Sequence, residues 1–119
     1  MIIGTGIDIV ELSRIEKLML KNERFEKKIL TKTEYSKFLT LGNKRKVEYL
    51  AGRFSAKEAF VKAVGTGIGK SYSWHDIEIL NDSSGKPYIK KKVNEQIHLS
   101  ISHSQFYVVS QVIIERLSS

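Results

Sequence analysis

Glu58 stands at a position where a carboxylate is costly. Apolar residues recur around it at helical spacing, with Phe54 four residues before it and Val61 three residues after it. A carboxylate on such a stripe has to be neutralised, paired with a cation or bound to a metal. Lys62 follows one helical turn later, and a glycine-rich run occupies residues 65–69. An acid in an apolar stripe, nearby cations and a glycine loop together predict a site for a phosphorylated ligand with a divalent cation.

The same residues also fit simpler roles. Glu58 could form a structural ion pair with Lys62, because structural pairs also perturb titratable groups. The glycines could be a plain helix stop and turn, since glycine commonly ends a helix. The run lacks the spacing of a P-loop and that of the dinucleotide fingerprint. The residue types alone therefore leave both interpretations open.

A second acid, Asp8, lies inside a predicted strand at residues 2–10. The segment is rich in β-branched residues, and strand geometry places Asp8 on the face opposite to Ile7 and Ile9. An acid is disfavoured inside a strand. Asp8 is therefore predicted to lie either on the exposed face of an edge strand or at a metal site.

The order of the residues is more specific than their types. The segment FSAKEAFVKAVGTGIG at residues 54–69 closely resembles the signature of the phosphopantetheinyl transferases, in particular of the short holo-acyl-carrier-protein synthase type. The segment GIDI at residues 6–9 resembles the first motif of that family, and SISHS at residues 100–104 resembles its S-[IL]-[ST]-H motif. The resemblance extends over essentially all 119 residues.

The resemblance implies an activity and a metal. The implied reaction transfers the phosphopantetheine group from coenzyme A to a serine of apo acyl carrier protein, giving holo acyl carrier protein and adenosine 3',5'-bisphosphate in support of fatty acid biosynthesis. The implied cofactor is Mg²⁺, with Asp8 and Glu58 as its protein ligands, and coenzyme A is a substrate. Asp8, Glu58 and Lys62 are the implied catalytic residues. The general base stays open between a metal-bound water and Glu58.

The resemblance also implies a set of contacts to coenzyme A. These residues are Arg45, Arg53, Phe54, Lys57, Lys62, Gly65, Thr66, Gly67, Ile68, Gly85, Lys86, Pro87, His103 and Ser104. In the family, the residues matching Arg45 and His103 lie near the phosphates, and the element matching residues 85–87 lies against the nucleotide. By itself, a histidine at a strand end also fits a surface or structural role.

A basic stripe follows the first strand. Ser13 and Glu16 form a predicted capping box that would start a helix. Four cations then recur at three- or four-residue spacing along one side: Arg14, Lys17, Lys21 and Arg24. A charged stripe is usually a solvated face, although here one sign prevails. In the family this helix receives the acidic helix of acyl carrier protein, so the resemblance implies that these four residues dock the carrier.

The elements that must position these residues predict an α+β fold. Short helices are expected at residues 25–30 and after the capping box Thr31–Glu34, a long helix from Lys44 to about Val64, and two hairpins, from strands 76–80 with 86–90 and 97–102 with 106–115. The resemblance implies a small antiparallel sheet packed with one long helix and shorter helices, in a single domain spanning residues 1–119. Family members of this type are trimers with active sites between subunits, which implies a homotrimer.

Composition narrows the partners. The net charge is +7, and the segment 14–62 alone carries 14 Lys and Arg against 6 Asp and Glu. Such a surface attracts nucleic acid, an anionic membrane or an acidic protein.

No cysteine, secretory signal or membrane span is found in the sequence, which predicts a cytoplasmic protein. The alternatives to the transferase are a basic nucleic-acid-binding module and a coenzyme A-binding protein without catalysis. The basic stripe carries no interleaved aromatics and no nucleic-acid motif, so we expect neither nucleic acid nor membrane as a partner.

Overall fold

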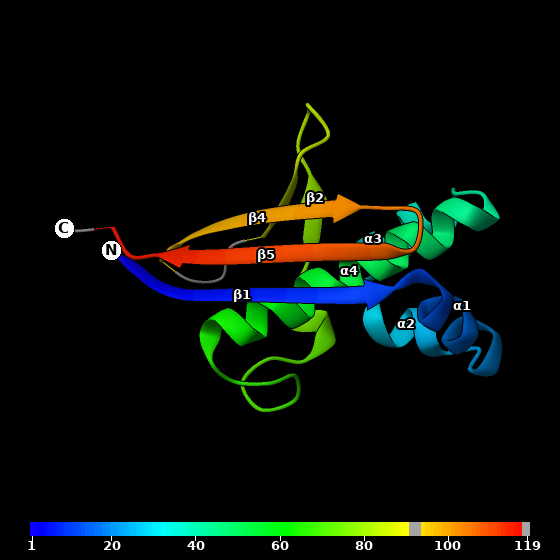
Figure 1. Cartoon of the computed structure of the whole chain (residues 1–119), viewed down its shortest axis with the longest axis horizontal. Coiled ribbons are helices and arrows are strands. Elements are labelled where there is room, and N and C mark those ends of the chain that lie inside the picture. The colour runs from blue at the N-terminus through cyan, green and yellow to red at the C-terminus, as the bar shows by residue number, and fades with distance from the viewer. Residues whose placement is uncertain (91–93, 118–119) are drawn as a thin grey trace.

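The computed structural model describes residues 1–90 and 94–117 of the chain (Figure 1). In chain order its elements are β1 (Ile2–Glu11), α1 (Leu12–Lys21), α2 (Phe25–Ile29), α3 (Lys32–Phe38), α4 (Asn43–Val64), the 3-10 turn η1 (Trp74–Asp76), β2 (Ile79–Asn81), β3 (Pro87–Ile89), β4 (Gln96–His103) and β5 (Tyr107–Glu115). The expected α+β fold, the long helix and both hairpins are confirmed.

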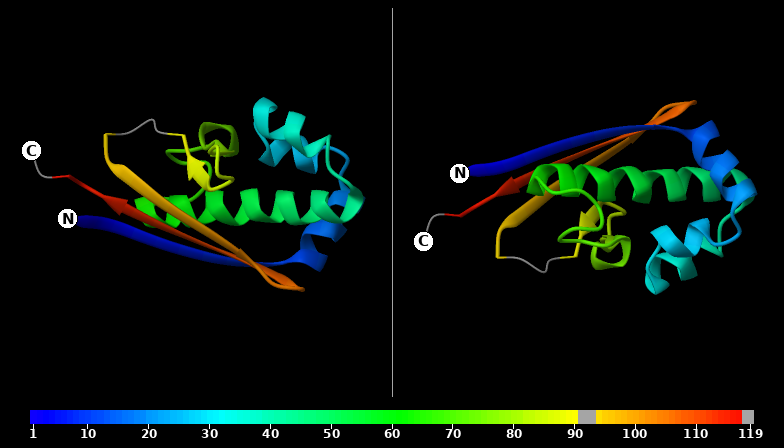
Figure 2. Two further views of the ribbon diagram at one scale, coloured as in Figure 1. Left: turned by 90° about the horizontal axis from the view of Figure 1, so that it is seen from above. Right: turned by 90° about the horizontal axis from the view of Figure 1, so that it is seen from below.

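The strands form two separate sheets. The larger is antiparallel with the order β1-β5-β4, and the smaller is the hairpin of β2 and β3. In Figure 2 the long helix α4 runs along one face of the larger sheet, while β2, β3, α2 and α3 lie on the other side of α4. The helix is therefore central, and from Leu50 to Ala63 only Glu58 and Lys62 are not buried. The sequence predicted that one apolar side of this helix is buried. In the structure nearly every side is buried, because neighbouring elements surround α4.

One face of the larger sheet is uncovered. Side chains alternate between the two faces of a strand, and on β5 the residues Val108, Ser110 and Val112 face α4 and are buried. On β1 the opposite face carries Ile7 and Ile9, whose side chains are 60% and 61% exposed. Asp8 lies on the face turned toward α4, as the alternation predicts.

Two glycines let β1 approach α4 backbone to backbone. A Cβ atom on Gly6 would lie 1.9 Å from the carbonyl oxygen of Ala59, and one on Gly4 would lie 2.0 Å from that of Ala63. Real Cβ atoms do not come this close to a carbonyl oxygen. The absence of a side chain at these two positions therefore sets the distance between β1 and α4.

The start of α1 differs from the prediction. Glu11 is both the last residue of β1 and the N-cap, so Ser13 lies inside the helix and the predicted capping box at Ser13 is wrong. The strand runs straight into the helix, and the N–H group of Leu12 donates to the carbonyl oxygen of Phe106 across the sheet at 2.9 Å. The turn between β4 and β5 thus supplies an acceptor for one of the first N–H groups of the helix, which have no partner within the helix itself. The capping box from Thr31 to Glu34 is confirmed.

Two other boundaries were also predicted wrongly. The expected strand 76–80 begins only at Ile79, because Trp74–Asp76 forms a 3-10 turn in which Asp76 accepts from the N–H of Ser73 at 2.8 Å. The first helix ends at Lys21, so Arg24 precedes α2 and is not on α1. Within the described ranges, no helix has both the length and the apolar character that crossing a membrane requires.

We expect Gly6→Ala to destabilise the protein strongly, because the new methyl group meets the backbone of α4 and cannot be relieved by a rotamer change. Overpacking of this kind costs about 1–3 kcal/mol and sometimes more. Urea denaturation measures the loss. The control is Gly67→Ala in the loop after α4, since a Cβ at Gly67 has no atom within 4 Å and its φ is not positive. Equal midpoints for the two variants would contradict the close approach of β1 to α4.

Candidate functional site

Asp8 and Lys62 meet where β1 crosses the last turns of α4. Lys62 Nζ donates to Asp8 Oδ1 at 3.0 Å and to the backbone carbonyl oxygen of Ile7, also at 3.0 Å. The Asp8 side chain is only 14% exposed. Its second oxygen, Oδ2, is buried and has no hydrogen-bond partner in the described part of the chain. A buried carboxylate oxygen without a donor is an acceptor that a ligand can use.

Glu58 is the second carboxylate of this cluster. Burial raises the pKa of its carboxyl above the ordinary value, and the charge of Asp8 raises it further, while Lys62 and Arg14 lower it. Among the described residues Glu58 forms no ion pair, because the ammonium group of Lys62 goes to Asp8. The structural pair between Glu58 and Lys62, one of the two sequence interpretations, is therefore not what the structure contains.

The two carboxylates suit a hard divalent cation. Asp8 and Glu58 repel one another, and one oxygen of Asp8 has no donor. In residues 1–90 and 94–117 no three His, Cys, Asp or Glu side chains are grouped to hold a metal ion. Mg²⁺ commonly takes only one or two protein carboxylates and completes its shell with water and phosphate oxygens. The donor set fits that pattern, with Asp8 and Glu58 as the residues that would hold the ion.

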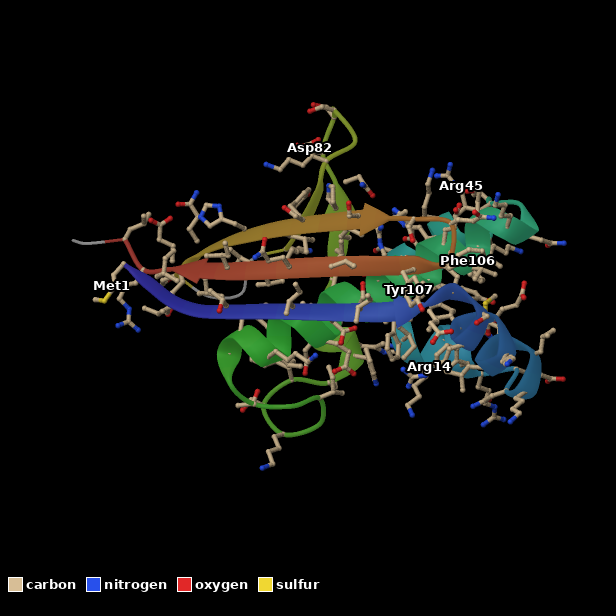
Figure 3. The ribbon with its side chains drawn as sticks, in the orientation of Figure 1. Met1, Arg14, Arg45, Asp82, Phe106 and Tyr107 are labelled. Atoms are coloured by element: carbon tan, nitrogen blue, oxygen red, sulfur yellow. The ribbon has the colours of Figure 1, made fainter. Side chains whose placement is uncertain are left out.

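The helix α1 reaches this cluster through Arg14. The Cζ atom of Arg14 lies 5.9 Å from the centre of the Phe54 ring, and Phe54 in turn stacks on Trp74 with the ring centres 5.1 Å apart. Arg14 is exposed and projects from α1 on the β1 side of the molecule (Figure 3). Lys17 and Lys21 are exposed on the same helix. The basic stripe therefore begins beside the carboxylates.

A second group of predicted residues surrounds a cavity of about 640 Å³. The lining residues that the sequence predicted are Arg45, Arg53, Gly85, Pro87 and His103. Within this group Arg53 is oriented by its neighbours: a terminal nitrogen donates to the carbonyl oxygen of Ile79 at 3.2 Å and to Asn81 Oδ1 at 2.8 Å. Its Nε is buried without a partner among the described residues. Arg45 pairs at 3.7 Å with Glu48, the one carboxylate among the lining residues, against the cations Lys37, Arg45 and Arg53. The cavity is thus cationic and suited to an anion such as a phosphate.

The carboxylate cluster and the cavity lie on opposite flanks of α4. Asp8 is on β1, at one edge of the larger sheet, and His103 is on β4, at the other edge. Figure 3 shows Arg14 on the β1 side and Arg45 on the β4 side. Because α4 and its side chains stand between them, one chain does not bring the two groups together. Within one chain the predicted site residues therefore form two separate groups.

Lys57 is not part of either group. Its ammonium group is fully buried and donates to the carbonyl oxygens of Ile29 and Trp74 and to Glu34 Oε1, at 2.7, 3.1 and 2.6 Å. Desolvation lowers the pKa of Lys57. An ammonium group has three hydrogens, and all three have partners here, so the structure does not bring Lys57 to a ligand. Helical spacing alone did not distinguish its environment from that of Glu58.

The remaining predicted residues lie in two turns and one loop. Gly65 ends α4 with a φ of 93°, a left-handed conformation that favours glycine. Next to it Thr66 has a buried Oγ1 without a partner among the described atoms, and Gly67 and Ile68 continue the same loop. Lys86 is exposed in the turn between β2 and β3. In the turn between β4 and β5, the hydroxyl of Ser104 accepts from the N–H of Tyr107 at 3.0 Å, which holds the turn itself.

Several cavity residues were missed in the sequence. They are Lys37, Leu41, Glu48, Tyr49, Gly52, Asn81 and Ile101. A signal existed for Tyr49, which precedes Arg53 by four residues on one helix, the spacing of an aromatic–cation pair. The guanidinium of Arg53 does lie over the Tyr49 ring, 4.2 Å from its centre. Asn81 gave no signal, because its role depends on how the hairpin packs against α4.

Comparison with known proteins identifies the class. The sequence model of the 4'-phosphopantetheinyl transferase superfamily matches residues 4–115. The match spans nearly the whole chain, and the protein therefore belongs to this superfamily.

Its relatives within the superfamily are consistent with one another. The chain is 60% identical over 119 residues to the holo-[acyl-carrier-protein] synthase of Halalkalibacterium halodurans, with 100% of each chain covered. It is 62% identical over 119 residues to the protein of the same name from Geobacillus sp., covering 99% of this chain and 100% of the relative. The fold matches the crystal structure of a holo-(acyl-carrier-protein) synthase from Bacillus anthracis in complex with CoA (3',5'-ADP), with a TM-score of 0.91, 50% identity and 97% of each chain covered.

Because the pKa of Glu58 is raised in the folded state, its ionisation should lower the free energy of unfolding in a pH-dependent way. The folded state holds the Glu58 proton more tightly than the unfolded state, so the associated stability is present at low pH and is lost as the pH rises through the raised pKa. Without metal, Glu58→Gln should therefore increase the unfolding free energy at pH 7, by less than about 1 kcal/mol because solvent screens the site. The gain should shrink toward pH 4.

Denaturant titrations at several pH values in chelator measure this difference. Glu23→Gln is the matched control, since Glu23 is an exposed acid between α1 and α2. A gain that does not change with pH, or that appears equally in the control, would show that Glu58 is not destabilised by burial and by Asp8.

Proposed function

We propose that this protein transfers the phosphopantetheine group of coenzyme A to a serine hydroxyl of an apo acyl carrier protein, in support of fatty acid biosynthesis. The products are holo acyl carrier protein and adenosine 3',5'-bisphosphate. The observation that carries the proposal is the pair of Asp8 and Glu58, with an unpartnered carboxylate oxygen beside Lys62, in a chain of this superfamily. Such a cluster suits a pyrophosphate held with a cation.

The cavity on the other flank of α4 supplies the binding of coenzyme A. Arg45 and Arg53 place positive charge around a space of about 640 Å³, and the imidazole of His103 adds a further N–H donor. Arginine binds phosphate through paired N–H groups, which gives geometric as well as electrostatic selection. Gly85 and Pro87 form another part of the wall, where the nucleotide would lie. We assign the nucleotide and its phosphates to this cavity.

The reaction needs charge to be neutralised more than it needs covalent chemistry. The serine oxygen forms a bond to the phosphorus that carries pantetheine, the bond from that phosphorus to the oxygen of the bisphosphate leaving group breaks, and the serine proton passes to a base, either Glu58 or a water. Positioning and electrostatics dominate such phosphoryl transfers. Lys62 lies beside Asp8 and would stabilise negative charge that develops on the phosphates. A bound Mg²⁺ would withdraw charge from the attacked phosphorus and steady the leaving group.

We assign the carrier protein to the basic surface that begins at α1. Arg14, Lys17 and Lys21 project from α1, and Arg24 is exposed just beyond it. An acidic helix laid on this surface would be attracted by the row of positive charges along its length. Arg14 also lies close enough to Glu58 for its charge to lower the pKa of that carboxyl, which links the same helix to the carboxylate cluster. A carrier docked here would present its serine at Asp8 and Glu58.

The test of the function is intact mass spectrometry of an apo acyl carrier protein incubated with this protein, coenzyme A and Mg²⁺. We expect a mass increase equal to one phosphopantetheine group, and none when a chelator is added. Asp8→Asn should slow the transfer by at least about a hundredfold, the size of effect seen when a key electrostatic group is removed. Glu23→Gln is the control: it removes an acid beside the basic docking surface, so its transfer should not fall below the wild-type rate. A folded wild-type protein that modifies no carrier would overturn the proposal.

We further propose that the protein acts as a homotrimer with its active sites between subunits. Two observations support this assembly. The uncovered sheet face exposes Ile7, Ile9 and Tyr107, an apolar surface of the kind that other copies cover. The carboxylate cluster and the phosphate cavity lie on opposite flanks of α4, so a second copy is needed to place one beside the other.

Mixing two inactive variants tests the shared site. One variant carries Asp8→Asn, and the other carries Arg45→Ala with His103→Ala, so each damages a different flank of α4. Co-expressed with different tags and purified as mixed oligomers, they should regain a substantial part of the wild-type activity, because some interfaces then join two intact parts. Two differently tagged Asp8→Asn chains provide the control and should stay inactive. Mixed oligomers without activity would show that each chain uses only its own residues.

A further inference from the structure

Glu34 is a buried carboxylate that the proposed chemistry does not use. It is 1% exposed, and it lies in the first turn of α3. Its Oε1 accepts from the backbone N–H of Thr31 at 2.8 Å, which closes the capping box, and from Lys57 Nζ at 2.6 Å. Its Oε2 accepts from the backbone N–H of Ile79 at 2.8 Å. One carboxylate thus joins the start of α3 to α4 and to β2.

Stability alone is a weak reason for this arrangement. A buried ion pair is often no more stabilising than apolar residues of the same volume, because both charges lose their hydration. The capping box itself needs only the bond from Thr31. The bonds to Lys57 and Ile79 go beyond what α3 requires. They fix the position of other elements relative to α3.

Of the elements that these bonds hold in place, the hairpin of β2 and β3 depends on them most. A two-stranded hairpin is marginal by itself, and among the described residues no strand pairing joins this one to the larger sheet. At Ile79 its outer edge is occupied by side chains: the N–H donates to Glu34, and the carbonyl oxygen accepts from Arg53 at 3.2 Å. Glu34 and Arg53 therefore take the place of a neighbouring strand.

The same bonds continue to the wall of the cavity. Arg53 donates to Asn81 Oδ1 at 2.8 Å, and Asn81 Nδ2 donates to the carbonyl oxygen of Gly85 at 2.9 Å. Arg53, Asn81 and Gly85 all line the cavity, whereas Glu34 does not. A second link runs through Tyr49, whose hydroxyl donates to the backbone carbonyl oxygen of Glu34 at 3.1 Å and whose ring lies under Arg53. Glu34 is thus connected to the cavity by two routes without reaching it.

We propose that Glu34, held by Lys57, is a positioning residue for the phosphate cavity. Its bond to the Ile79 N–H holds β2 where Arg53 and the turn at Gly85 face the ligand. Glu34 therefore governs the affinity for the nucleotide end of coenzyme A and leaves the transfer step at Asp8 unaffected. The identity of that ligand rests on the proposed function; the connection from Glu34 to Arg53 does not.

Glu34→Gln tests the proposal with almost no change in shape. An amide has one acceptor oxygen and one donor NH₂ group. If its oxygen stays with Thr31 and Lys57, its NH₂ group faces the N–H of Ile79, and that bond is lost. We expect the KM for coenzyme A and the Kd for adenosine 3',5'-bisphosphate to rise about tenfold, the effect of one lost hydrogen bond. The kcat and the KM for the carrier should stay within about twofold, which separates binding from chemistry.

Val10→Ala is the control for loss of stability alone, because Val10 is buried on β1 in the core cluster that does not include Ile79. Amide exchange of Ile79, followed by NMR, reads the bond directly and should accelerate in Glu34→Gln but not in the control. A double-mutant cycle of Glu34→Gln with Asn81→Ala should be non-additive, since both residues act through Arg53. A variant with lower stability, an unchanged KM and normal exchange at Ile79 would overturn the proposal.

Two measures keep the outcome decisive. If Glu34→Gln does not fold, Glu34→Leu combined with Lys57→Met replaces both charges by apolar side chains, which buried pairs tolerate. This variant also lacks an acceptor for Ile79, so a folded form with a normal Kd for adenosine 3',5'-bisphosphate would refute the positioning role. Binding of the bisphosphate is measured by calorimetry without a carrier protein. A wild type that binds it but transfers nothing would therefore refute the proposed function and leave the role of Glu34 open to the same test.

Discussion

The contact of β1 with α4 is the constraint on which the candidate site depends. Gly4 and Gly6 bring the strand against the backbone of the helix at Ala63 and Ala59. Asp8 follows two residues after Gly6 on the same face, so the distance set by the glycines also sets the reach of its carboxylate. At a wider spacing Lys62 could not bond both Asp8 and the carbonyl oxygen of Ile7. The close packing of Gly4 and Gly6 on α4 therefore determines whether Lys62 can pair with Asp8.

The central position of α4 has a second consequence. A helix buried on nearly all sides is usually apolar all round, yet α4 carries Arg53, Ser55 and Lys57 in its buried part. Each of them bonds a different neighbour: Arg53 the hairpin, Ser55 the β5 residue Ser110, and Lys57 the start of α3. Because an unpaired polar group in an interior is costly, these three side chains tie each surrounding element to one position on the helix. The buried polar residues of α4 thus fix where each neighbouring element lies along the helix, while its apolar residues supply the packing of the core.

The sequence predicted where helices and strands lie better than it predicted what surrounds their side chains. Periodicity located α4, and strand alternation placed Asp8 opposite Ile7, because both depend on local geometry. The role of Lys57 was missed, because neighbouring helix positions differ in burial only once α3 and the 3-10 turn are packed on them. The wrong capping box at Ser13 has a similar cause: the acceptor for Leu12 comes from Phe106, far along the chain. At Glu58 the periodicity left two roles open, a structural ion pair and a metal ligand. The order of the residues, through its resemblance to a family, favoured the metal ligand.

The division of the site between two flanks of α4 follows from the small size of the chain. With one central helix and a three-stranded sheet, the two sheet edges lie on opposite sides of that helix. If residues of β1 and β4 act on one pyrophosphate, as proposed above, different copies have to contribute them. The uncovered face of the sheet, with Ile7 and Ile9 exposed, supplies a surface on which copies can pack without disturbing either flank. Assembly would then complete the site and cover the sheet through the same contact, so that one set of interactions serves stability and catalysis together.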